Sequence, residues 1–285
     1  MVSNGSAEPG EPAATFTEID GFRCYAPELA RDHADYPSDG FAVTAAVEAS
    51  SFWCRSRNRV LRGVVERFTD PLRPLAMLEI GCGIGGVVGA LRRFPHLRLT
   101  ASEIYIQGLR YARSKFPDVD FIQLDATAIP FRSEFDIVGA FDVLEHIQDD
   151  ERVMQGVHEA LRPGGLFIVT VPQYQWMWSA LDDIVRHKRR YSRSDLLRKI
   201  RRNHFDVLFC SSFVSTLFPA MAASRLLSRG RLAPDDEKKA FAAEVTLPRA
   251  ANRVCDWVMR VDELALRLGM SLPFGGSLLV VARKS

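Results

Sequence analysis

The fold of this chain can be predicted from one short stretch, Met77-Leu78-Glu79-Ile80-Gly81-Cys82-Gly83-Ile84-Gly85-Gly86. An apolar run leads into an acidic residue and a glycine-rich turn, and the apolar-periodic segment 87–94 follows. This order predicts a strand, a tight turn and a helix. Because glycine has no Cβ, a ligand can approach the backbone of such a turn closely. The turn is therefore the first candidate for a cofactor site.

Two kinds of cofactor could occupy this turn. Its glycine spacing is similar to a dinucleotide-binding fingerprint, but Val87 and Val88 follow the last glycine, so the match is imperfect. A pyrophosphate bound at a helix N-terminus would be disfavoured by the neighbouring carboxylate of Glu79, whereas a cationic ligand would be attracted to it. Glu79 therefore favours a cationic cofactor.

Acidic residues end two of the strands expected further along. Glu103 lies roughly 20 residues after the glycine turn, which is the spacing of a βαβ unit, although NAD enzymes share this position. A carboxylate there can accept hydrogen bonds from both hydroxyls of a ribose. Asp125 ends the next strand. The segments with a strand-like apolar pattern are 97–103, 121–126, 135–142 and 161–172, the last including a Pro-Gly-Gly turn.

In this order and spacing, the motifs at 77–172 resemble those of class I S-adenosylmethionine-dependent methyltransferases. The subgroup resembled is the broad one of ubiquinone-pathway and small-molecule O- and C-methyltransferases. The resemblance implies an α/β fold with a Rossmann-like, seven-stranded sheet whose last strand is antiparallel. It also implies that the glycine turn holds the methionine end of S-adenosyl-L-methionine, Glu103 the ribose and Asp125 the adenine amino group. The expected cofactor-binding residues are Glu79, Gly81, Cys82, Gly83, Gly85, Glu103, Ile104, Asp125, Ala126 and Phe141.

We divide the chain into four regions. Residues 1–15 are rich in small and polar residues and are expected to be disordered. Residues 16–75 are expected to form an N-terminal helical cap, and 76–210 with 276–285 the cofactor-binding core. Between the last two strands lie roughly 65 residues, far more than a hairpin needs. Their helical pattern predicts a lid over the acceptor at 211–275.

Composition argues against several kinds of partner. The net charge of +2 gives no long-range field for nucleic acid. The longest apolar stretch, 207–227, is interrupted by polar residues, so no membrane span is expected, although peripheral contact stays open. Five scattered cysteines without a CxxC pair indicate reduced thiols and a cytoplasmic protein. The segment 22–36 could fold over the site or form a homo-oligomer by pairing with a neighbouring subunit.

Methyl transfer from a sulfonium is a direct displacement, so alignment and exclusion of water can supply most of the catalysis. An oxygen or nitrogen acceptor would still need a base, and His146 and His187 are the candidates. His146 follows the fourth core strand, and His187 lies within 182–191, where D-x-x-x-x-H-x-R-R-Y is similar to a signature of the subgroup. The alternatives are a histidine bonded to the backbone and a solvated basic face.

The pattern Asp142-x-x-Glu145-His146 resembles a metal-associated cluster of some ubiquinone-pathway O-methyltransferases. Because the pattern is common in the subgroup without a metal, no metal is expected. Similarly, the segment 52–58, F-W-x-x-x-R-N, resembles a signature that precedes the core, and its aromatic residues or Arg57 could close over a ligand.

Aromatic residues near the sheet edge and in the predicted lid suggest a hydrophobic acceptor, such as a prenylated or aromatic natural product. Packing within a helix core is the alternative role for many of them. The sequence does not decide between carbon and oxygen as the attacked atom. A protein that binds the cofactor without transferring methyl is the competing functional class. The expected substrate residues are Tyr25, Trp53, Trp176, Trp178 and Phe213.

Overall fold

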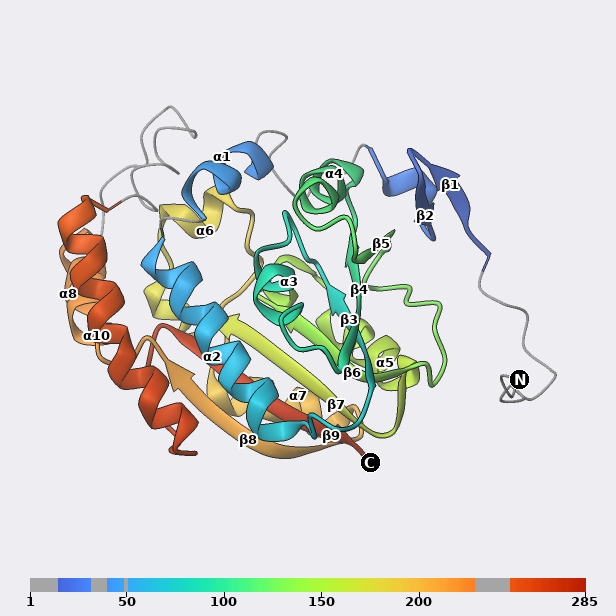
Figure 1. Ribbon diagram of the computed structural model, residues 1–285. Helices are drawn as coiled ribbons and strands as arrows, with labels where there is room; N and C mark the ends of the chain where they lie inside the picture. The colour runs from blue at the N-terminus through green and yellow to red at the C-terminus, as the bar shows by residue number, and fades with distance from the viewer. Residues whose placement is uncertain (1–14, 32–39, 49–50, 229–246) are drawn as a thin grey trace.

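The computed structural model describes residues 15–31, 40–48, 51–228 and 247–285, which form a nine-stranded sheet with helices on both faces (Figure 1). The strand order is β1-β2-β5-β4-β3-β6-β7-β9-β8. The tail predicted to be disordered lies, except for residue 15, outside the described residues. The strands are β1 (Thr17–Ile19), β2 (Phe22–Cys24), β3 (Leu75–Ile80), β4 (Leu97–Glu103), β5 (Asp120–Gln123), β6 (Phe135–Phe141), β7 (Leu161–Pro172), β8 (Phe205–Phe213) and β9 (Ser277–Lys284).

The seven neighbouring strands β5-β4-β3-β6-β7-β9-β8 form the predicted core sheet. Strands β3 to β7 pair in parallel, whereas β9 runs antiparallel between β7 and β8. The central strands are apolar almost without interruption because helices cover both of their faces. The predicted fold class, with an antiparallel last strand, is therefore confirmed.

Helices cover the two faces of this sheet with separate apolar clusters. One cluster packs α5 (Asp150–Ala160) and α7 (Arg193–Arg202) on the sheet. The other contains residues of α2 (Phe52–Phe68), α3 (Gly86–Leu91) and α10 (Arg249–Arg267). The remaining helices are α1 (Gly40–Val47), α4 (Ile106–Lys115), α6 (Ala180–Ile184), α8 (Phe218–Ser228) and the short 3-10 helices η1 (Pro27–Leu29), η2 (Leu144–His146) and η3 (Gln175–Met177). No helix of the described residues is long and apolar enough to cross a membrane.

The N-terminal region differs from the prediction of a helical cap at 16–75. Strands β1 and β2 form an antiparallel hairpin, and β2 adds in parallel to the edge of β5. The turn is Asp20-Gly21, with φ of 56° and 73°. An Asp-Gly pair with positive φ at both positions makes a type I′ hairpin turn, whose twist matches that of the strands. The helical prediction is therefore wrong at 17–24. The sequence signal for the hairpin is the Asp20-Gly21 dipeptide.

The insertion between β8 and β9 packs along α2 through buried charges. The guanidinium of Arg59 in α2 donates to both carboxylate oxygens of Glu263 in α10, at 2.7 and 2.6 Å, and to Asp256 at 2.8 Å. The Ser56 hydroxyl donates to Glu263 as well, at 3.0 Å. Arg59 and Glu263 are only 8% and 5% exposed. These bonds fix α10 against the outer side of α2, where Figure 1 shows the two helices side by side.

Replacing Glu263 with Ala is expected to lower the free energy of unfolding by about 3–5 kcal/mol, because a buried guanidinium would lose its main partner. Chemical denaturation of the variant and the wild type measures this difference. Arg260→Ala on the same helix is the matched control. Its side chain is 59% exposed and 3.7 Å from Glu263, so its loss should change stability by less than about 0.5 kcal/mol. Equal effects of the two substitutions would show that the buried pair adds nothing beyond surface charge.

Candidate active site

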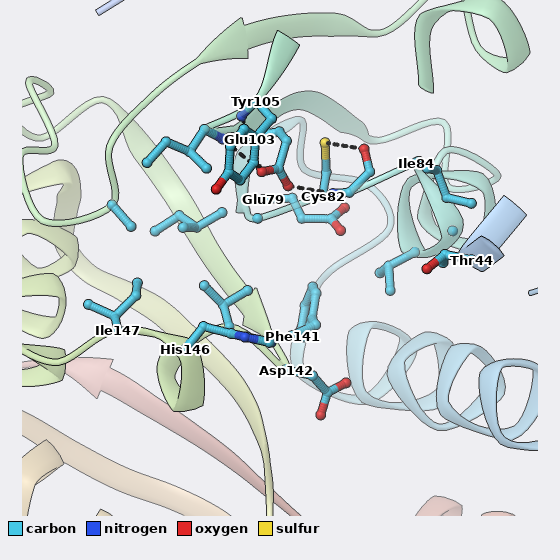
Figure 2. Close-up of a pocket in the computed structure, with 18 of the residues that line it drawn as sticks. Thr44, Glu79, Cys82, Ile84, Glu103, Tyr105, Phe141, Asp142, His146 and Ile147 are labelled. Carbon is cyan, nitrogen blue, oxygen red and sulfur yellow. Dashed lines mark hydrogen bonds between the residues drawn. The ribbon is translucent and has the colours of Figure 1, made fainter. Parts of the chain in front are cut away.

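A cavity of about 560 Å³ opens at the carboxyl ends of the central parallel strands. Open α/β sheets bind ligands at this edge, where neighbouring strands diverge. Residues of α1, α2, η2 and the ends of β3, β4, β5 and β6 line the cavity. Figure 2 shows Glu79, Cys82 and Glu103 on one side of it and Asp142 and His146 on the other. Two different groups of side chains therefore face one space.

The glycine turn after β3 forms the floor of this cavity. Gly81 and Gly83 have positive φ, 68° and 54°. A Cβ on Gly81 would lie 2.5 Å from a methyl group of Val143, whereas a Cβ on Gly83 would meet nothing within 4 Å. Gly81 is thus required by the packing, and Gly83 leaves open space beside the backbone. Gly85 does not line the cavity; it caps α3 in a left-handed conformation.

Glu79 is the carboxylate that ends β3. It is 2% exposed, and its Oε2 has no hydrogen-bond partner among the described residues. The pKa of Glu79 is raised to about 8, mainly by burial; Arg57 opposes this rise, and Glu48 and Glu103 add to it. A buried carboxylate without a partner is costly and is stabilised by a cation. This orphaned oxygen fits the cationic methionine end of S-adenosylmethionine.

Glu103 ties two backbone turns together. Its Oε2 accepts the N–H of Gly83 at 2.9 Å, and its Oε1 accepts those of Ile104 at 2.9 Å and Tyr105 at 3.4 Å. Burial raises the pKa of Glu103 and these backbone hydrogen bonds lower it, with a net rise. A carboxylate has about four acceptor positions, so capacity remains for ribose hydroxyls. The structural role of Glu103 in shaping the glycine turn was not foreseen from the sequence.

We expect Glu103→Ala to weaken binding of S-adenosylhomocysteine by about 1–3 kcal/mol, because the ribose hydroxyls would lose their acceptor. Calorimetry measures this loss. Since the substitution also frees the backbone turn, a second ligand separates the two effects. An analogue without the ribose hydroxyls should bind the wild type more weakly than the parent ligand does, whereas the variant should bind the two ligands equally. If the variant still bound the analogue more weakly than the parent ligand, by as much as the wild type does, the ribose assignment would be rejected.

The other predicted cofactor residues lie around these two carboxylates. Asp125 follows β5 and accepts the backbone N–H and the hydroxyl of Thr127, both at 2.8 Å. Thr127, which also lines the cavity, was missed because nothing in the sequence marks it as a partner of Asp125. Burial raises the pKa of the Cys82 thiol, so it is a poor nucleophile. The predicted residues that line the cavity are Glu79, Gly81, Cys82, Gly83, Glu103, Ile104, Asp125, Ala126 and Phe141.

The opposite wall comes from α2 and the end of β6. Arg57 forms an ion pair with Asp142 at 3.0 Å, and its guanidinium lies 4.8 Å from the ring centre of Trp53. Asp142 adopts a φ of 58°, just where β6 ends. This pair joins residues far apart in the sequence, so the sequence alone could not reveal it. Trp53 is the one predicted substrate residue that lines the cavity.

The two candidate histidines lie against each other. His146 lines the cavity, whereas His187 lies behind it, with the ring centres 4.6 Å apart and nearly perpendicular. His187 Nδ1 is 2.7 Å from the carboxylate of Asp182, which also accepts two hydrogen bonds from Arg190. Burial alone would raise the pKa of Asp182, but the bonds from His187 and Arg190 outweigh it and lower the pKa to about 2. The carboxylate therefore stays ionised and fixes the orientation of His187.

Three of these side chains could also hold a metal ion. One ligand atom from each of Glu145, His146 and His187 lies within 4.8 Å of the others. Burial raises the pKa of Glu145 well above its usual value, and Asp142 raises it further. Because these three side chains could act as ligands, the expectation of no resident metal stays a prediction.

Four predicted substrate residues lie away from the cavity. Tyr25 packs on Phe131 beside the N-terminal hairpin, and Phe213 is fully buried at the end of β8. Trp176 packs against Tyr174 and Phe218, and Trp178 donates to Asp183 at 2.9 Å. None of the four lines the cavity, and their assignment to the acceptor site stays a prediction.

The lid expected at 211–275 stays a prediction. No described residue of the predicted lid at 211–275 lines the cavity. The described part of this insertion instead supports the outer side of α2, and residues 229–246 lie outside the described residues. The described residues on this side of the cavity are Phe41 and Thr44 of α1, Trp53, Cys54 and Arg57 of α2, and Glu48 between the two helices.

Comparison with known proteins agrees with this geometry. Residues 78–169 match the family model described as a methyltransferase domain. The ubiquinone biosynthesis O-methyltransferase of Idiomarina loihiensis is 28% identical over 128 residues, 42% of this chain and 52% of that protein. The trans-aconitate 2-methyltransferase of Azoarcus sp. is 29% identical over 119 residues, 41% of this chain and 46% of that protein. The matched segments span about half the length of these relatives.

Among solved structures, the [4+2]-cyclase SpnF resembles this chain with a TM-score of 0.52 and 22% identity, over 80% of this chain and 81% of that one. The family match and this likeness confirm that the chain has the class I methyltransferase fold. Residues 78–169 are a methyltransferase domain, and S-adenosylmethionine is the cofactor of this class.

Proposed function

We propose that this protein transfers a methyl group from S-adenosylmethionine to a hydrophobic small molecule. The observation that carries the proposal is the buried carboxylate of Glu79 at the edge of a cavity of about 560 Å³, where its Oε2 has no hydrogen-bond partner in the part of the chain that the structure describes. The bound cofactor would supply an electrophilic methyl group. Glu79, the glycine turn and Glu103 would hold it, because they offer a carboxylate for the cation, space beside the backbone and acceptors for the ribose.

The residues across the cavity would act on the acceptor. His146 would take a proton from an oxygen or nitrogen nucleophile, and His187, oriented by Asp182, would support it. Walls of Trp53, Val143 and Ile147 would exclude water and hold an apolar acceptor against the methyl group. The proposal of an apolar acceptor rests on these lining residues alone. The named relatives do not narrow the choice of acceptor, because they range from a quinone-pathway enzyme to one named for trans-aconitate. The five free cysteines support a cytoplasmic setting.

Fold alone does not establish the chemistry, as the likeness to a [4+2]-cyclase illustrates. The decisive experiment uses S-adenosylmethionine with a labelled methyl group, a panel of apolar acceptors that includes quinone precursors, and detection of both S-adenosylhomocysteine and the methylated product. We expect stoichiometric formation of the two. The Glu79→Gln variant is the control for cofactor-dependent turnover. Tight cofactor binding without product from a metabolite extract would favour the alternative, a binding protein that does not transfer methyl.

A further inference from the structure

The outer face of α10 carries a row of exposed apolar side chains. They recur at intervals of three and four residues, so they form one stripe along the helix. Trp257 is 75% exposed and Leu268 71%. Large apolar side chains gathered on one exposed helix face usually mark an interaction surface. The members of this apolar stripe are Val254, Trp257, Val261, Leu264 and Leu268.

The charges of α10 are divided between its two faces. All three carboxylates point inward: Asp256 and Glu263 bind Arg59, and Asp262 accepts the backbone N–H groups of Ser215 and Thr216. The exposed charged side chains of the helix are four arginines, Arg249, Arg253, Arg260 and Arg267. The exposed face is thus apolar and purely cationic.

This charge pattern opposes pairing with a second copy of the chain. In a two-helix seam formed by the apolar stripe, residues beside the stripe face each other across the interface. Arg253, Arg260 and Arg267 repeat every seven residues beside it, whereas Val258 and Ala265 occupy the other side. All three carboxylates of α10 are held on its inner side, where Glu263 lies 3.7 Å from Arg260 of the same helix, so two antiparallel copies would place like charges together.

We propose that this face of α10 docks on the surface of an anionic lipid bilayer. A helix with tryptophan and leucine on one side of its exposed face and arginines beside them lies at the headgroup boundary, where both groups find partners. The helix would lie on the membrane without crossing it. On its inner side, α10 packs against α2. The other side of α2 carries Trp53 and Arg57, which line the cavity. Docking would thus place the cavity one helix away from the lipid, whatever reaction it performs.

Vesicle co-sedimentation of the full chain tests the proposal. Vesicles of phosphatidylcholine mixed with phosphatidylglycerol should bind the protein, vesicles of phosphatidylcholine alone should bind it far less, and added salt should release it. Arg249→Glu with Arg253→Glu should weaken binding by at least roughly fivefold for each arginine changed. Trp257→Ala with Leu264→Ala should also reduce binding. Both pairs are exposed, so the fold should survive, which circular dichroism checks.

Matched controls make the outcome decisive. Arg93→Glu with Arg98→Glu causes the same change in net charge at other exposed positions, and Leu72→Ala removes an exposed leucine elsewhere. Both controls should leave vesicle binding unchanged. Equal losses in the controls, or no binding by the wild type, would overturn the proposal. So would self-association in analytical ultracentrifugation that Trp257→Ala with Leu264→Ala abolishes, since this would assign the face to a second copy.

Discussion

Replacing His146 with Gln is expected to lower kcat by roughly 10²–10⁴-fold if the acceptor is attacked through oxygen or nitrogen. Among the described residues, His146 is the histidine that lines the cavity, so it can reach an acceptor proton. His187→Gln should lower kcat as well, because His187 packs on His146 and is fixed by Asp182. In the wild type, kcat should rise with pH as the base loses its proton. Measuring kcat against pH for the wild type and both variants tests these expectations.

The matched control for this experiment is His96→Gln. The carbonyl of His96 accepts the N–H of Leu75 at the start of β3, the end of the sheet opposite to the cavity. This substitution should leave kcat and its pH profile unchanged. A flat profile with small losses in both cavity variants would indicate a carbon acceptor, which needs no deprotonation before methylation. Substitution of Trp53 should then cost more than either histidine.

Cofactor affinity is expected to rise by up to roughly tenfold per pH unit between about pH 5 and pH 8 and then to level off. The reason is the pKa of Glu79, which burial raises to about 8. A cationic ligand favours the ionised carboxylate, so binding below pH 8 must release a proton. Calorimetry in buffers with different ionisation enthalpies measures that proton directly. Glu79→Gln should bind weakly and without this pH dependence.

The raised pKa of Glu79 also affects the stability of the ligand-free protein. The folded pKa of Glu79 lies above its usual value of 4.5, so the folded state holds the proton more tightly than the unfolded one. This contribution to stability is complete below about pH 4.5 and is lost as the pH rises toward 8. At pH 8 the Glu79→Gln protein should therefore be more stable than the wild type although it binds the cofactor poorly. Equal stability at both ends of this range would contradict the assigned pKa.

The cofactor side of the site could be predicted because its signals are local. Glu79, Glu103 and Asp125 each follow an apolar run, and the carboxyl ends of parallel strands meet at one edge. The acceptor side could not, because its wall is made by long-range contacts. Arg57 meets Asp142 across 85 positions of sequence. Trp176 follows β7 as a site residue would, but it contacts Phe218 and does not line the cavity, a placement that the sequence alone does not give.

The position of β9 has a consequence for how the chain is made. This strand, residues 277–284, is inserted between β7 and β8, and most of it is fully buried. While the ribosome is still translating the segment before it, the nascent chain holds two unpaired strand edges that face the same gap. Unpaired edges are templates for aggregation. A nonsense codon or ribosomal stall upstream of Ser277 should therefore yield an aggregating product, even though the whole glycine turn has already been synthesised.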